Sequence, residues 1–381
     1  MSLITFHLFD MDGVLLKPLG YHTSLRTSVK RIGKALGAPK TELTTDEIAK
    51  FEALSVTNEW DSVAICTAVI LVHIWGGDGS IRLDGLKPRP QTVTIEKPDF
   101  SAFLDTFHQV GHLPGQSAYQ KLMTDHPWLN DGQQDYLALV LQHSRDIYTS
   151  PTLPGYQETV LGSEAFQKNY GLPPQLQIAS YLVTHDQPFL NQDQTTAFRR
   201  WLARPGNAAG ILTNRPCRTP AGYLSSPEAE LGAKLVGLEN LPLLGSGLLA
   251  WYAVTQRSLP DHTYLKPNPV HTLGLLQMIL GEQPETALSR AALLADGQGD
   301  RADWEALEGA RVVIYEDAAK GLQSGIAARE KLAAIGIRID LKLIGVTDHS
   351  TKHRALEGLA DEIIPAIHHL DWIDEDGTRL Q

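Results

Sequence analysis

Two aspartates, Asp10 and Asp12, stand two positions apart where an early apolar run of the chain ends at a glycine. The run from Leu3 to Phe9 is short and rich in β-branched and aromatic residues, which is typical of a buried parallel strand. Because residues i and i+2 of an extended backbone point to the same side, the two carboxylates are expected to converge on one small volume. Two ionised carboxylates so close repel each other, and a hard divalent cation with oxygen ligands, Mg2+ by preference, would relieve the repulsion.

Further polar groups follow apolar segments later in the chain. The carboxyl ends of parallel strands meet at one edge of a sheet, and that edge is where such folds bind ligands. We therefore expect one cluster of four carboxylates, a hydroxyl and a lysine. Besides Asp10 and Asp12, the residues concerned are Thr213 and Asn214 after the segment 208–212, Lys266 after 264–265, and Glu316 and Asp317 after 311–315.

Several of these residues also have a purely structural interpretation. Asp317 could cap the helix expected from Ala318, and Thr213 could simply end a strand. Lys266, taken alone, would be an ordinary surface lysine. Arg215 has two open interpretations: it reaches a phosphate or a second anionic group of a substrate, or it is a surface arginine.

The elements that must position these residues alternate from about residue 192 onward, which predicts a doubly wound, Rossmann-like parallel α/β sheet that includes the first strand. The expected strands are 208–212, 241–244, 311–315, 341–346 and 362–364, and the expected helices are 192–203, 227–236, 268–280, 318–334 and 351–357. We interpret the polar stretch 281–309 as an extra surface excursion, and the acidic stretch Asp371 to Asp376 as exposed.

A long helical or irregular block separates the first strand from the rest of the sheet. Its expected helices lie near 22–37, 44–75, 99–110, 133–147 and 156–169. The prediction is therefore an α/β core domain formed by residues 1–17 and 186–381, with an inserted helical domain at 18–185. The most apolar run, Val63 to Trp75, is too short to span a bilayer and is expected to be a buried helix.

The overall composition excludes some classes of protein. The chain has 381 residues, 43% of them hydrophobic and 20% charged, as in a globular protein of about two domains. The net charge of −11 argues against nucleic acid or an anionic membrane as the partner. Two widely spaced cysteines indicate neither a disulfide framework nor a zinc site, and no signal-peptide pattern begins the chain, so we expect a cytoplasmic protein.

The order of these motifs resembles that of the haloacid dehalogenase-like (HAD) hydrolase superfamily. The resemblance rests on DMDGVL at 10–15, the apolar strand ending in Thr213, Lys266-Pro267, and Glu316-Asp317 followed by AAKGLQSGIAAR. It implies that Asp10 is the nucleophile, Asp12 the general acid and base, and Thr213 and Lys266 the groups that hold a phosphate, with Asn214 as a further phosphate contact. It also implies that Glu316 and Asp317 hold Mg2+ together with Asp10 and the backbone carbonyl of Asp12.

The inserted domain resembles the C1-type helical cap of the same superfamily. Such a lid excludes water while the nucleophile is attacked and admits it for hydrolysis. With about 165 residues, the insertion is longer than a minimal four-helix lid, so the resemblance does not extend to its details.

The function that the resemblance implies is that of a Mg2+-dependent phosphatase, which hydrolyses a small phosphorylated metabolite through an aspartyl-phosphate intermediate. The chemistry is reasonable because phosphoryl transfer is mainly a matter of positioning and of neutralising charge. The sequence leaves two alternatives open, a sugar phosphomutase that uses the same site and a non-catalytic ligand-binding protein with the same fold. It also leaves open the substrate, the cap residues that select it and the oligomeric state.

Overall fold

The computed structural model describes residues 4–54, 56, 58–76, 80–88, 95–110 and 113–369. The chain divides into two compact units: the first runs to Pro18 and resumes at Asp186, and the second comprises Leu19–His185. Leu3 and the acidic stretch Asp371 to Asp376 lie outside the described residues.

The first unit is built on a six-stranded sheet in which every neighbouring pair of strands is parallel. This confirms the predicted doubly wound α/β fold. The strands are β1 (Thr5–Phe9), β4 (Asn207–Leu212), β5 (Leu243–Leu244), β6 (Arg311–Glu316), β7 (Asp340–Val346) and β8 (Glu362–Ile364), in the spatial order β5-β4-β1-β6-β7-β8.

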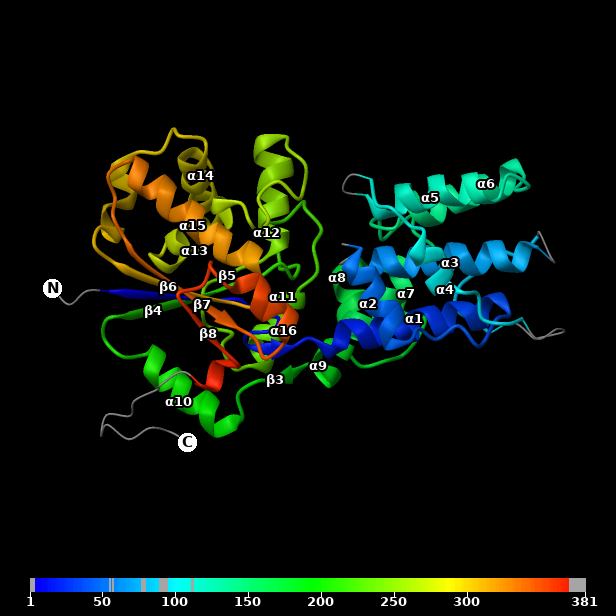
Figure 1. Ribbon diagram of the computed structural model, residues 1–381, viewed down its shortest axis with the longest axis horizontal. Helices are drawn as coiled ribbons and strands as arrows, with labels where there is room; N and C mark the ends of the chain where they lie inside the picture. The colour runs from blue at the N-terminus through cyan, green and yellow to red at the C-terminus, as the bar shows by residue number, and fades with distance from the viewer. Residues whose placement is uncertain are drawn as a thin grey trace. The chain divides into compact units, whose positions relative to one another are not determined.

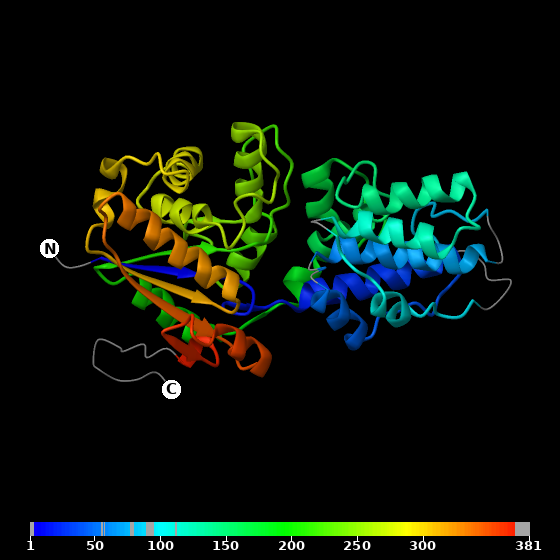
Figure 2. The same ribbon diagram turned by 45° about the horizontal axis from the view of Figure 1, so that its top comes forward.

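Helices cover both faces of this sheet, as Figures 1 and 2 show. Helices α13 and α15 pack on one face, and α10 packs against β4 on the other. The α-helices of the unit are α10 (Gln192–Leu202), α11 (Glu228–Leu235), α12 (Ser246–Trp251), α13 (Pro269–Ile279), α14 (Pro284–Ala295), α15 (Ala319–Ala334) and α16 (Ser350–Leu356). Shorter turns are the π-helix η1 (Tyr252–Gln256) and the 3-10 helices η2 (Arg301–Leu307) and η3 (Ile367–His369).

Strand β1 lies between β4 and β6 in the middle of the sheet, and nearly all of its side chains are buried there. Phe6, Leu8 and Phe9 are almost fully enclosed. The ring of Phe9 stacks on Tyr315 of β6 with 4.5 Å between centroids, and it meets Phe198 of α10 edge-on. These contacts fix β1 beside β6, with Phe9 opposite Tyr315. The residues that follow these two strands must therefore emerge side by side.

The interpretation of residues 281–309 as a surface excursion is wrong. This stretch forms helix α14 and the turn η2, and α14 packs against α13 (Figure 1). Leu288, Trp304 and Leu307 are fully buried in the main core. The polar residues between them suggested a surface loop, but the apolar residues recur at helical spacing and cover α13.

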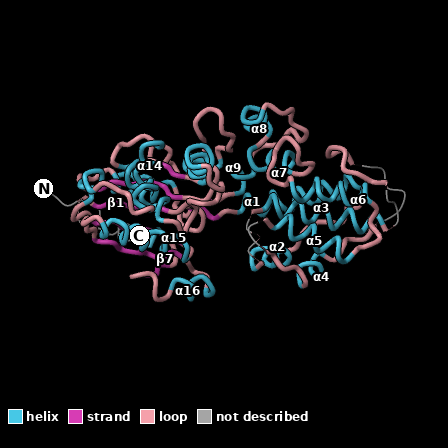
Figure 3. Tube along the Cα trace, turned by 90° about the horizontal axis from the view of Figure 1, so that it is seen from above, coloured by secondary structure: helices cyan, strands magenta, loops and turns pink. Residues whose placement is uncertain are grey.

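Helices are the only regular elements that the described residues of the second unit form, and loops connect them, as the tube in Figure 3 shows. Its helices are α1 (Leu19–Leu36), α2 (Thr45–Ala53), α3 (Glu59–Trp75), α4 (Phe100–Asp105), α5 (Pro114–Asp125), α6 (Asp131–Gln142), α7 (Leu153–Leu161), α8 (Ser163–Tyr170) and α9 (Tyr181–His185). The apolar run from Val63 to Trp75 lies in α3 and is almost wholly buried, as predicted. No helix among the described residues is long and apolar enough to cross a membrane.

Two predicted helices of this unit are each divided in two. The segment 44–75 forms α2 and α3, and the segment 156–169 forms α7 and α8. The second break lies at Gly162, whose φ of +81° is a conformation that residues with a side chain rarely adopt. A Cβ there would also come within 2.6 Å of the backbone nitrogen of Ser180. The chain turns at Gly162 because glycine alone fits.

A small antiparallel ladder joins the two passages of the chain at the edge of the first unit. Strand β2 (Leu16–Lys17) pairs with β3 (Gln187–Pro188), with Leu16 opposite Pro188 and Lys17 opposite Gln187. This ladder therefore holds two segments together within the α/β unit. One follows Asp10 and Asp12, and the other returns from the helical unit.

Candidate active site

Asp10 lies immediately after β1 and is almost fully buried. Its backbone nitrogen donates to the carbonyl of Tyr315 at 2.9 Å, which continues the ladder between β1 and β6. The chain then turns tightly at Gly13, which has a φ of +83°. A Cβ at Gly13 would overlap the carboxylate of Asp317, so this glycine provides both the turn and the space for a neighbouring acid.

Three carboxylates come together at this point. Oxygen atoms of Asp10, Glu316 and Asp317 all lie within 4.8 Å of one another. Glu316 ends β6 and Asp317 follows it, beside the end of β1. Gly321 of α15 leaves room for this group, because a Cβ there would overlap the carboxylate of Glu316.

The cluster is electrostatically unfavourable without a compensating cation. Burial raises the pKa of Asp10 to about 6; Lys266 opposes that rise, and Asp317 and Asp12 add to it. Burial, followed by the charge of Asp10, also raises the pKa of Glu316 well above its ordinary value. Both carboxylates would give up protons more readily if a positive charge were added among them.

Lys266 supplies one such charge. Its Nζ donates to Oδ1 of Asp10 at 2.6 Å, to Glu316, and to the backbone carbonyl of Leu212 at 3.1 Å. Burial opposes the charge of this ammonium group, but Asp10 and Glu316 outweigh that effect and raise the pKa of Lys266. Lys266 is therefore a buried cation, not a surface lysine.

Thr213 and Asn214 follow β4, next to β1 in the sheet. Thr213 is buried, and its hydroxyl oxygen accepts a hydrogen bond from the backbone nitrogen of Arg215 at 3.1 Å. Asn214 is exposed. Both residues lie at the predicted edge of the sheet.

The carboxylate of Asp12 faces Arg215. It is not part of the three-carboxylate cluster of Asp10, Glu316 and Asp317. Nε of Arg215 donates to both oxygens of Asp12, at 3.0 and 2.9 Å, and Nη2 also contacts Asp12. Nη2 donates to Oδ2 of Asp186 at 2.8 Å as well. The interpretation of Arg215 as a surface arginine is wrong, since only 1% of its side chain is exposed.

Sequence reasoning missed two contributors to this site and one pairing. Asp186, just before β3, and Lys352 of α16, which pairs with Asp317, are far from the motifs in the chain. Arg215 was noticed, but its pairing with Asp12 was not. The only sequence signal for that pairing is its position two residues after Thr213, which places it at the same edge of the sheet.

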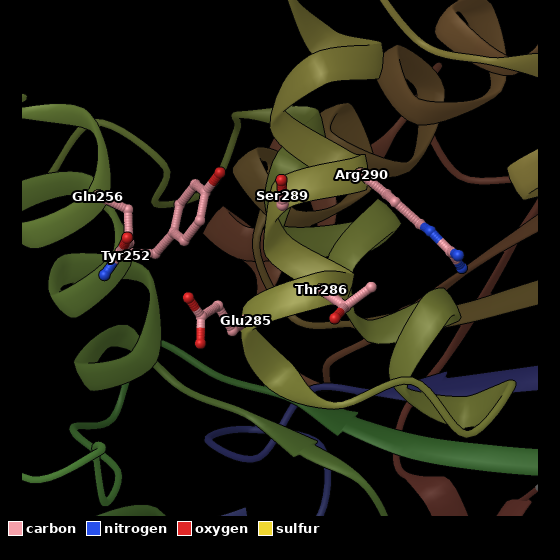
Figure 4. A pocket seen from close by; sticks show the side chains of 6 residues that line it. All are labelled: Tyr252, Gln256, Glu285, Thr286, Ser289 and Arg290. Atoms are coloured by element: carbon pink, nitrogen blue, oxygen red, sulfur yellow. The ribbon is translucent and has the colours of Figure 1, made fainter.

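A separate pocket of about 560 Å³ lies between η1 and α14 (Figure 4). Its one cationic residue, Arg290, is engaged by Glu282 at 2.7 Å and Asp303 at 3.1 Å and points away from the other lining side chains. The lining residues are Tyr252, Gln256, Glu285, Thr286, Ser289 and Arg290. None of them is among the residues of the carboxylate cluster.

Comparison with known proteins bears on the fold. No family model matches the chain, and no curated protein matches its sequence. The chain shares its fold with a crystal structure solved as target ZR25 of the Northeast Structural Genomics Consortium, at a TM-score of 0.61 and 14% identity, over 95% of this chain and 96% of that one. This likeness shows a shared fold.

A second solved structure, named phosphatase Tt82 from Thermococcus thioreducens, aligns over 93% of this chain and 99% of its own. The TM-score is 0.45 and the identity 14%.

Proposed function

We propose that this protein is a Mg2+-dependent phosphatase, which hydrolyses a small phosphate monoester through an aspartyl-phosphate intermediate. The observation that carries the proposal is the contact of Lys266 with Asp10 beside the convergence of Asp10, Glu316 and Asp317. A nucleophile, a phosphate-binding cation and a set of oxygen ligands then occupy one edge of the sheet.

The residues of the site fit a hard divalent cation. Three carboxylates are the oxygen ligands that Mg2+ prefers, and the missing side chains at Gly13 and Gly321 leave the space they need. When all are ionised, these acids with Asp12 and Asp186 exceed the nearby cationic groups of Lys266, Lys352 and Arg215 by two negative charges. Asp10, Glu316 and Asp317 would hold the ion, which when bound would neutralise charge on the phosphate.

The protein side chains would then carry the two steps of hydrolysis. An oxygen of Asp10 attacks phosphorus, the ester bond to the leaving oxygen breaks, and Asp12 gives that oxygen a proton. Asp12 next takes a proton from the water that attacks the aspartyl-phosphate, and inorganic phosphate leaves. Lys266 compensates the negative charge of the phosphoryl group throughout, and the Thr213 hydroxyl is placed to hold one of its oxygens.

We assign the helical unit, residues 18–185 in the predicted division, the role of a C1-type cap. Its place in the chain supports this assignment, because the insertion leaves the α/β unit directly after the turn that carries Asp10 and Asp12. Substrate selectivity would then depend on residues of this unit.

The test is release of phosphate from para-nitrophenyl phosphate with and without Mg2+. Asp10→Asn removes the nucleophile and should abolish Mg2+-dependent release while the circular dichroism spectrum stays that of the wild type. Undiminished release by the variant would sink the nucleophile assignment. A panel of sugar, nucleotide and polyol phosphates, with analysis for isomerised products, would identify the substrate class and distinguish a phosphatase from a phosphomutase.

A further inference from the structure

Three charged side chains, two of them buried, are linked in the order Asp186, Arg215, Asp12. Arg215 uses Nε and Nη2 on Asp12 and Nη2 on Asp186. The side chains of Arg215 and Asp186 are 1% and 0% exposed, whereas a third of the Asp12 side chain remains exposed. Two of the three side chains are thus enclosed, and only the last is accessible from outside.

The backbone on either side of Arg215 is also fixed. Its nitrogen donates to Oγ1 of Thr213, and its carbonyl accepts from the nitrogen of Ser246 at 3.0 Å. A Cβ at Gly232 of α11 would come within 3.2 Å of Nη1 of Arg215, so the helix makes space for the guanidinium. The arginine therefore has little freedom except in the direction of the two carboxylates.

Burying Asp186 beside Arg215 has a large desolvation cost, and such pairs are often no more stabilising than apolar side chains of the same size. The arrangement instead fixes the orientation of the Asp12 carboxylate. A planar guanidinium that contacts both oxygens of a carboxylate holds it in a single plane, as an ammonium group cannot. Asp186 fixes the other side of the same guanidinium.

We propose that Asp186 is a positioning residue for the proton transfer by Asp12. It holds the guanidinium of Arg215, which in turn keeps the Asp12 carboxylate in the orientation in which its exposed part meets the leaving oxygen. This inference rests on the proposed phosphatase function. Asp186 lies in the segment that returns from the helical unit, two positions before Pro188. The inference gives this residue a role at the turn that carries Asp10 and Asp12.

The test compares two reactions that differ in their need for a proton. Para-nitrophenolate is a stable anion and leaves without one, so kcat/KM for para-nitrophenyl phosphate reports attack by Asp10 alone. Oxygen exchange between inorganic phosphate and heavy-oxygen water needs the proton. In that reaction Asp10 bonds to phosphorus, the hydroxyl of monohydrogen phosphate leaves with a proton from Asp12 as water, and a labelled water then reverses the step.

For Asp186→Ala we expect the exchange rate, measured by mass spectrometry, to fall by at least about tenfold. The kcat/KM for para-nitrophenyl phosphate should change less than about twofold. Both rates scale with the same folded fraction, so their ratio is unaffected if part of the variant misfolds. Asp186→Asn keeps an oxygen acceptor for Nη2 and should restore most of the exchange.

The matched control is Asp61→Ala in the helical unit. Asp61 is as buried as Asp186 and is also paired with an arginine, Arg145, at 2.9 Å. Its loss should leave the ratio of the two rates at the wild-type value.

The other outcomes separate the two proposals. Equal loss of both reactions in Asp186→Ala, or no loss of either, overturns the positioning role and leaves the phosphatase function standing. A wild-type protein that neither hydrolyses the aryl phosphate nor exchanges phosphate oxygen overturns the proposed function and the positioning role with it.

Discussion

Nζ of Lys266 lies 2.6 Å from Oδ1 of Asp10, although the two residues are 256 positions apart in the chain. The same ammonium group contacts Glu316, so one buried cation bridges two buried carboxylates from neighbouring strands. The third acid of the cluster, Asp317, has its own cation in Lys352. Among the described residues, these two lysines form ion pairs with Asp10, Glu316 and Asp317.

Replacing Lys266 by Met should destabilise the metal-free protein strongly. The change leaves Asp10 and Glu316 buried without their shared cation, and losing one partner of a buried ion pair costs about 3–5 kcal/mol of unfolding free energy. Added Mg2+ should recover part of this loss. Urea unfolding with and without Mg2+ measures both effects.

The control for that experiment is Lys342→Met, which removes an exposed pair with Glu362. It should cost at most about 1 kcal/mol and show no response to Mg2+ beyond that of the wild type. If Lys266→Met is equally unstable with and without Mg2+, the three acids do not hold the ion.

Lys352→Ala should increase the affinity for Mg2+. The ammonium group of Lys352 contacts Asp317 from a largely exposed position, and an incoming ion must displace it. An exposed pair contributes about 0.2–1 kcal/mol, which corresponds to an affinity gain of up to about fivefold. Calorimetric titration with Mg2+ measures the change, and an unchanged or weaker affinity would show that Lys352 does not compete with the ion.

Gly13→Ala should abolish phosphatase activity. The added Cβ would overlap the carboxylate of Asp317 and would sit on a backbone with φ of +83°. Gly309→Ala is the matched control, because its φ is +76° and nothing lies within 4 Å of the new Cβ. Both variants should lose roughly 1 kcal/mol of stability through backbone strain, but only Gly13→Ala should lose activity. Equal activities in the two variants would contradict the role of Gly13 in placing Asp317.

The free energy of unfolding should fall at acid pH because of the buried His271. Burial, together with the charge of Lys266, lowers the pKa of this histidine from 6.5 to about 3, so the folded state keeps it neutral. The unfolded chain takes up a proton below about pH 6.5, so the stability that the neutral histidine contributes is present above that pH and is lost as the pH falls towards 3.

The variant His271→Gln isolates this effect. Its amide can donate to the carbonyl of Leu244, as Nε2 of His271 does at 3.1 Å, but it does not titrate. Between pH 7 and pH 4 the wild type should lose about 3 kcal/mol more unfolding free energy than the variant. Parallel stability curves over that range would rule out the buried neutral histidine.

Much of the fold could be predicted from local patterns. The strands around Phe9, Leu212 and Tyr315 are short apolar runs, and the polar residues that follow them mark the carboxyl edge of the sheet. The stretch 281–309 could not be interpreted in this way, because its local polarity does not reveal that Leu288, Trp304 and Leu307 are buried in the main core. Local polarity misleads where tertiary packing decides which side chains are buried.

The sequence by itself determined which residues gather at the edge of the sheet, because parallel strands end at the same side and their last residues must meet there. It could not determine how those charges pair. Asp12 follows Asp10 by two positions, yet its carboxylate turns to Arg215 while Asp10 turns to Lys266. Only the tertiary structure decided this, since a buried charge takes the oppositely charged group that packing brings within reach, and Asp186 and Lys352 reach the site from segments with no motif of their own.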